Sequence, residues 1–145
     1  MATFFGGQNF EILEFTATIS PGATNILFNV PSNSFAYLQS IQISPTAGVG
    51  GSPRYEFICG YSTSGRESFT TGVRNLNGIG SATTDYVNYL VYDYNNGNEH
   101  IEDNSGASTS VGVPVGLSGQ QMKIISTSSS VNLSYKITIV HVTGK

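Results

Sequence analysis

The chain has 145 residues, of which 39% are hydrophobic and 10% are charged, and its formal net charge is −3. This length fits one domain with a packed core, and the hydrophobic content excludes an intrinsically disordered chain. The six Lys and Arg residues are spread along the sequence, which argues against the basic face that a nucleic-acid-binding protein needs.

The N-terminal part predicts an arm followed by a strand. We expect the arm at residues 1–9 and a single β-sandwich domain at residues 10–145, whose first strand spans residues 10–19. Apolar residues before and after Leu13 have opposite parity, so a β-bulge is expected there. The sequence Ser-Pro-Gly at residues 20–22 predicts a turn, because Pro fixes φ and Gly reaches positive φ.

Two further strands are expected at residues 25–30, which Pro31 ends, and at residues 35–43. A Gly- and Pro-containing loop at residues 44–53 follows. In the second of these strands, the residues expected on one face are Phe35, Tyr37, Ile41 and Ile43.

The middle of the chain alternates cleanly at residues 54–62, where Cys59 shares a parity with three aromatic residues and is expected to be a buried hydrophobe. Residues 63–83 are less regular and allow one short strand. A strong strand is predicted at residues 84–94. Four tyrosines lie in it, at positions 86, 89, 92 and 94, and their parities differ, so some are expected on the outer face of the sheet.

The C-terminal part predicts a loop and a hairpin. Residues 95–119 contain many turn residues and are expected to be mostly loop, with a short strand at residues 111–115. Residues 121–127 and 131–142 alternate strictly and are joined by three serines, which predicts a β-hairpin.

These elements predict an all-β protein with seven or eight strands and no helix of note. Turn residues recur about every ten positions, which is typical of an antiparallel β-sandwich or barrel. The unequal loops favour Greek-key connections, so a jelly roll is the first expectation. An immunoglobulin-like sandwich is the alternative, although the chain has no Trp and no cysteine pair.

No motif in the sequence predicts an enzyme or a cofactor. The only histidines are His100, expected in a polar loop, and His141, expected at the edge of the core. The acidic residues at 93–104 could offer oxygen ligands to Ca²⁺, but their spacing fails the EF-hand pattern, so a solvated hairpin loop is expected. With Cys59 alone, no intrachain disulfide can form, which suggests assembly in a reducing cytoplasm. Residues 1–9 lack the features of a signal peptide, and no apolar run is long enough for a membrane helix.

Candidate interface residues lie in the arm and in the tyrosine-rich strand. Two phenylalanines precede Gly6 and Gly7, and such residues on a short arm are expected to dock on their own domain or on a neighbouring subunit. Outward tyrosines suit an interface or a platform for stacking sugars. The predicted interface residues are Phe4, Phe5, Tyr89, Tyr92 and Tyr94.

The chain resembles small structural proteins of tailed bacteriophage virions in three features: the opening Met-Ala-Thr-Phe-Phe-Gly-Gly, the neutral strands rich in Ser, Thr, Asn and Gly, and the predicted closing hairpin at 119–139. This resemblance implies a head-decoration (cement) protein, assembled in the host cytoplasm. Such a protein is commonly a homotrimer that binds the major capsid protein and stabilises the shell.

We therefore expect a non-enzymatic virion protein whose partners are copies of itself and the capsid, without nucleic acid or membrane. One alternative is a phage tail, fibre or knob module. Another is a carbohydrate-binding module, in which Tyr89, Tyr92 or Tyr94 would bind the sugar.

Overall fold

A computed structural model describes residues 3–4, 8–46, 53–61, 67–70, 74–76, 84–93, 98–103, 108–109, 113–128 and 130–144. All regular elements within these ranges are β-strands, which confirms the all-β class. The strands are β1 (Thr3–Phe4), β2 (Gln8–Ile19), β3 (Thr24–Asn29), β4 (Ser34–Pro45), β5 (Arg54–Gly60), β6 (Glu67–Thr70), β7 (Arg74–Asn75), β8 (Asp85–Asp93), β9 (Asn98–Asp103), β10 (Ser108–Thr109), β11 (Val115–Gly116), β12 (Gln121–Ser126) and β13 (Leu133–Thr143).

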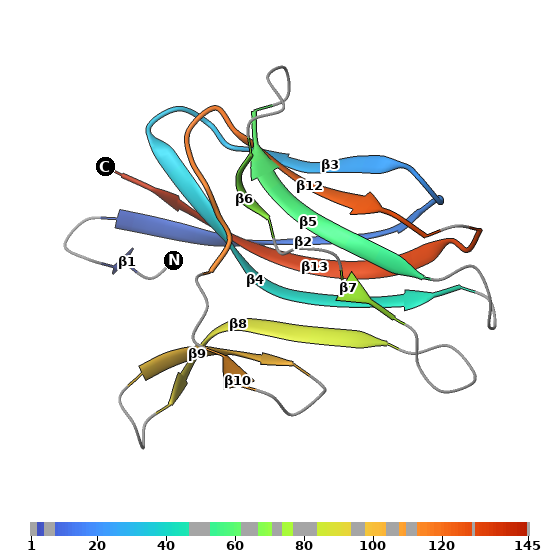
Figure 1. The fold of residues 1–145 in the computed structure, drawn as a ribbon. Coiled ribbons are helices and arrows are strands. Elements are labelled where there is room, and N and C mark those ends of the chain that lie inside the picture. The colour runs from blue at the N-terminus through green and yellow to red at the C-terminus, as the bar shows by residue number, and fades with distance from the viewer. Residues whose placement is uncertain are drawn as a thin grey trace.

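The strands form two antiparallel sheets that face each other (Figure 1). The larger sheet has the order β1-β2-β13-β4-β8-β9-β10, with β11 also paired to β4, and the smaller sheet has the order β3-β12-β5-β6, with β7 also paired to β5. If β2, β3, β4, β5, β6, β8, β12 and β13 are counted one to eight, the two sheets are ordered 1-8-3-6 and 2-7-4-5. This is the jelly-roll arrangement of two Greek keys, so the predicted fold is confirmed.

The closing hairpin predicted from residues 121–142 is wrong. β12 pairs with β3 and β5 in the smaller sheet, whereas β13 pairs with β2 and β4 in the larger sheet. The short polar linker between them carries the chain from one sheet to the other. Two alternating strands separated by a few serines are compatible with either connection, and only the pairing partners decide between them.

The acidic stretch and the loop that was expected around it also differ from the prediction. Residues 98–103 form β9, which pairs with β8 and adds a strand to the larger sheet beyond the jelly-roll core. This stretch contains a single apolar residue, Ile101, so it carries no alternation that could indicate a strand. Residues 94–97 and the predicted strand at 111–115, up to residue 112, lie outside the described residues.

The core lies between the two sheets. Alternate residues of β4 and β13 point inward from the larger sheet, and alternate residues of β5 and β12 point inward from the smaller one. Burying one large apolar side chain contributes roughly 1.5–3 kcal/mol, so these four strands supply much of the stability. The fully buried large side chains include Leu38, Ile41, Phe57, Met122, Ile124, Ile137 and Ile139.

Two hydrogen bonds connect the sheets, one of them buried and the other partly buried. The Tyr55 hydroxyl in β5 donates to Oδ2 of Asp85 in β8 over 2.7 Å. The Asn25 amide in β3 donates to the Tyr135 hydroxyl in β13 over 3.0 Å. Both tyrosines are buried, so their rings fill the core while their hydroxyls fix how the sheets face each other.

The turn predicted at residues 20–22 is present. The Ala23 amide donates to the Ser20 carbonyl over 3.0 Å, and Gly22 has φ of 76°. Pro at the second position and a left-handed Gly at the third describe a type II β-turn, which connects β2 in the larger sheet to β3 in the smaller one.

The bulge predicted in β2 is wrong, and a bulge occurs in β4 instead. The pairing of β2 with β13 runs without a register shift. Between β13 and β4, Thr138 pairs with Ser40 but Ile139 pairs with Leu38, which leaves Gln39 as the extra residue. The β2 strand therefore alternates regularly, and Ile12 lies on its outer face with 61% of its surface exposed.

The β4 bulge also corrects the expected face of that strand. Because one extra residue reverses the alternation, Phe35 and Tyr37 lie on the outer face, whereas Ile41 and Ile43 are buried in the core. In the sequence the four residues share one parity, which predicts one face. Only the register of β4 against β13 shows the extra residue.

Candidate functional site

The predicted interface residues lie in different environments. Phe4 is in β1, which pairs with Gln8 and Asn9 at one edge of the larger sheet, and Tyr92 is in β8 opposite Glu99. Tyr89 belongs to the hydrophobic core of the single chain, with 6% of its surface exposed. Phe5 and Tyr94 lie outside the described residues. The contacts proposed for these five residues therefore stay predictions.

Tyr86 lies on the outer face of β8. It is 45% exposed, whereas Asp85, Val87 and Tyr89 alternate with the outward residues and are buried. The burial of Val87 and Tyr89 gives the signal for this position, because Tyr86 and Asn88 alternate with them and must then face outward.

One half of the outer face of the larger sheet is apolar. Ile12, Val140 and Tyr37 lie side by side on β2, β13 and β4. A second row of three side chains follows at the next outward position of the same strands. Ile12 is exposed, while the two valines in the middle strand are buried. We call this surface the apolar half; its residues are Phe10, Ile12, Phe35, Tyr37, Val140 and Val142.

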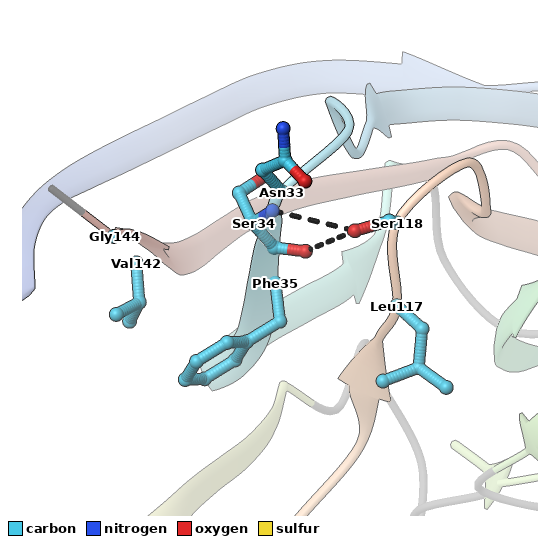
Figure 2. Close-up of a pocket in the computed structure, with 7 residues that line it drawn as sticks. All are labelled: Asn33, Ser34, Phe35, Leu117, Ser118, Val142 and Gly144. Carbon is cyan, nitrogen blue, oxygen red and sulfur yellow. Dashed lines mark hydrogen bonds between the residues drawn. The ribbon is translucent and has the colours of Figure 1, made fainter.

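A hollow of about 480 Å³ borders the apolar half (Figure 2). Phe35 and Val142 line it from the sheet, and Leu117, which is 50% exposed, lines it from the turn before β12. The Ser118 hydroxyl donates to the Ser34 carbonyl over 2.7 Å, and the Ser34 amide donates to the same hydroxyl over 3.3 Å. The polar atoms of Ser34 and Ser118 are thus bonded to each other, and Phe35, Leu117 and Val142 extend the apolar surface into the hollow.

The other half of the outer face is polar, and its two charged side chains have opposite signs. It contains a hollow of about 300 Å³ that reaches from β8 to β2. The Lys136 Nζ and Glu14 Oε2 atoms lie 3.6 Å apart, and both side chains are about half exposed. We call this surface the polar half; its side chains are Glu14, Ser40, Gln42, Tyr86, Asn88, Lys136 and Thr138.

The histidine expected at the edge of the core is buried beside a carboxylate. His141 is 7% exposed, its Nδ1 lies 3.1 Å from Oε1 of Glu11, and its ring packs edge-on against Phe28 at 5.0 Å between ring centres. Its Nε2 is buried without a hydrogen-bond partner. Neither His141 nor Glu11 lines the two hollows described above, so the pair does not face a substrate-sized space there. His100 lies in β9.

The structure gives Cys59 the role expected from its parity. Its side chain is fully buried, and burial raises the pKa of the thiol from 9.0 to about 12. A neutral buried thiol is a poor nucleophile. Among the described residues, no three His, Cys, Asp or Glu side chains are grouped closely enough to hold a metal ion. A helix with the length and apolarity to cross a membrane is likewise not found in the described part of the chain.

Comparisons with known proteins give only distant matches. No family model matches the sequence, and no curated protein matches it. Among solved structures, a chain from the capsid asymmetric unit of cyanophage Pam1 is similar with a TM-score of 0.41 and 13% identity, covering 99% of this chain and 91% of that one. A chain from the disulfide-linked pili of Bacillus endospore appendages gives a TM-score of 0.39 and 10% identity, covering 95% and 88%. A chain from the virus-like particle of the Macrobrachium rosenbergii extra small virus gives 0.30 and 11%, covering 100% and 84%.

Proposed function

We propose that the protein is a non-enzymatic structural protein of a virion, which decorates the head shell as a cement protein and assembles as a homotrimer. The observation that carries the proposal is the apolar half of the larger sheet. The outer face of a sandwich sheet normally alternates with polar residues, because it faces water. Here two adjacent rows of three apolar side chains occupy that face, and such patches are typical of protein contacts.

The proposed occupant of the apolar half is the N-terminal arm of a second copy. β1 pairs with the residues immediately before Phe10, so the arm begins at the border of the apolar half. The arm carries Phe4 and Phe5, which are apolar ligands for such a surface. Burial of each large apolar side chain contributes roughly 1.5–3 kcal/mol. Arms exchanged around a ring make several weak contacts act together, and the resulting trimer would bind the shell through repeated copies of one site.

The surface chemistry supports a contact that is insensitive to salt. None of the six residues of the apolar half is charged, and the whole chain carries few charges. Screening by salt weakens contacts between exposed charges but not apolar burial. We therefore expect assembly to persist at high ionic strength, which suits a protein that must remain on a particle.

The test combines a size measurement with capsid binding. Light scattering coupled to size-exclusion chromatography should give a trimer mass for the native chain. Ile12→Lys should give a monomer, because it places a charge in the apolar half. Thr18→Lys is the matched control, since Thr18 is exposed on the same strand beyond the apolar half. The native chain, but not Ile12→Lys, should bind capsids assembled without it. A native monomer without affinity for capsids would exclude the proposal.

A further inference from the structure

The polar half of the larger sheet contains two aligned rows of side chains. Tyr86, Gln42 and Lys136 are direct neighbours on β8, β4 and β13. Asn88, Ser40, Thr138 and Glu14 form the next row on β8, β4, β13 and β2. Because adjacent strands are about 4.8 Å apart, the second row spans about 14 Å. The two rows therefore form an elongated surface that is long enough to contact more than one ring of a bound ligand.

The β4 bulge creates this arrangement. Gln39 is the extra residue, and it changes the parity immediately before Ser40, so Ser40 and Gln42 face outward beside Thr138. Without the bulge, alternation from Tyr37 would instead turn Ile41 and Ile43 outward and bury Ser40 and Gln42. Bulges also bend a sheet and increase its twist, and they often occur beside functional sites. The hollow of about 300 Å³ is lined by Ser40, the residue that follows the bulge.

The side chains of the polar half match the chemistry of a sugar. Tyr86 presents an exposed aromatic ring, which can contact the apolar C–H face of a pyranose. Around the ring, the amides of Gln42 and Asn88 and the hydroxyls of Ser40 and Thr138 both donate and accept hydrogen bonds. Such groups suit the hydroxyl groups of a sugar, because each hydroxyl also donates and accepts hydrogen bonds. A concave surface with a few such converging groups is typical of a ligand site.

The charges of the polar half favour a neutral ligand. Lys136 and Glu14 are the two charged side chains that line the hollow, and they lie 3.6 Å apart with opposite charges. Their fields largely cancel, and both are exposed to screening by salt. An acidic saccharide would gain from Lys136 but meet Glu14 in the same place. The hollow thus has no net charge with which to select an ionic ligand.

We propose that the polar half binds a neutral oligosaccharide, with one sugar ring stacked on Tyr86 and adjacent hydroxyl groups bonded by Gln42, Ser40 and Asn88. The site uses the larger sheet of one copy and is separate from the apolar half. This site places the sugar contact at Tyr86, whereas the sequence alone pointed to Tyr89, Tyr92 or Tyr94.

The test is a titration of the full chain with maltotriose, cellotriose and triacetylchitotriose, followed by NMR amide shifts. At least one of the three should bind with a Kd of roughly 1 mM or tighter, and its shifts should map to β4, β8 and β13. Tyr86→Ala should weaken binding about tenfold or more, whereas Tyr86→Trp should retain it. Tyr61→Ala is the matched control, because Tyr61 is 43% exposed but lies next to β5 in the smaller sheet.

Further outcomes separate this site from other ligands and from assembly. Lys136→Gln should change the affinity for the neutral trisaccharide less than about threefold, and a sulfated heparin disaccharide should bind more weakly than the neutral one. No binding of any trisaccharide, or equal losses in Tyr86→Ala and Tyr61→Ala, would overturn the proposal. Tyr86→Ala should keep the oligomeric mass and Ile12→Lys should keep saccharide binding, so the two proposals fail independently.

Discussion

Replacing Tyr55 with Phe removes one oxygen atom from the contact between the two sheets. The native hydroxyl donates to the Asp85 carboxylate over 2.7 Å, and both residues are buried. The ring of Phe occupies the same space, so the packing in the core is retained. The change therefore isolates the hydrogen bond between β5 and β8 from the burial of the aromatic ring.

The size of the effect follows from the kind of acceptor. Hydrogen bonds to charged groups contribute roughly 1.5–3 kcal/mol, whereas bonds between neutral groups contribute about 0.5–1.5 kcal/mol. Tyr55→Phe should thus lower the free energy of unfolding by about 2 kcal/mol. For a domain of this size, that corresponds to a fall in Tm of roughly 8 °C. Urea denaturation followed by circular dichroism measures the free energy, and calorimetry measures Tm.

Tyr135→Phe is the matched control for this prediction. Its hydroxyl accepts from the neutral Asn25 amide over 3.0 Å, also between the sheets, so its loss should cost about 1 kcal/mol or less. In an Asp85→Asn background, the cost of Tyr55→Phe should fall to the same neutral range. If Tyr55→Phe costs no more than Tyr135→Phe, the charge-assisted bond between the sheets does not contribute as argued.

Four further predictions concern two buried residues and the β4 bulge. Gly116→Ala should destabilise the fold by about 1–3 kcal/mol in urea denaturation, because the new Cβ would lie 2.9 Å from Met122 Cγ; an unchanged midpoint would show that the site can relax. Cys59 should react with a thiol reagent only after unfolding, and fast labelling of the native chain would contradict its burial. Burial raises the pKa of the Cys59 thiol to about 12 in the folded chain, so the thiol ionises at a lower pH in the unfolded chain. The stability that the neutral buried thiol contributes should be full below pH 9 and lost as the pH rises toward 12. Urea denaturation at several pH values measures this loss. Deletion of Gln39 should preserve the native circular-dichroism spectrum, because Leu38 and Ser40 already pair with consecutive residues of β13 and keep their faces; a chain that no longer folds would contradict the bulge.

Alternation and turn residues along the chain were sufficient to predict the all-β class and the turn at residues 20–22, and the unequal loops favoured the jelly roll. These depend on local chemistry: period-two burial, Pro and Gly at fixed turn positions, and the absence of helical spacing. The burial of Cys59 and the presence of an outward tyrosine in β8 follow from the same alternation. Composition also indicated the neutral surface, because few charged residues were present to cover it.

Pairing and register were decided only by the tertiary structure. Residues 121–142 look like a hairpin, yet their two strands join different sheets, because a strand's sequence does not encode which neighbour completes its hydrogen bonds. The Gln39 bulge reverses the faces of β4, so it gathers Phe35 with Ile12 in the apolar half and Gln42 with Tyr86 in the polar half. Sequence parity identifies faces only within a strand that has no bulge, whereas a surface site also requires neighbouring strands to be aligned, and that alignment exists only in the folded sheet.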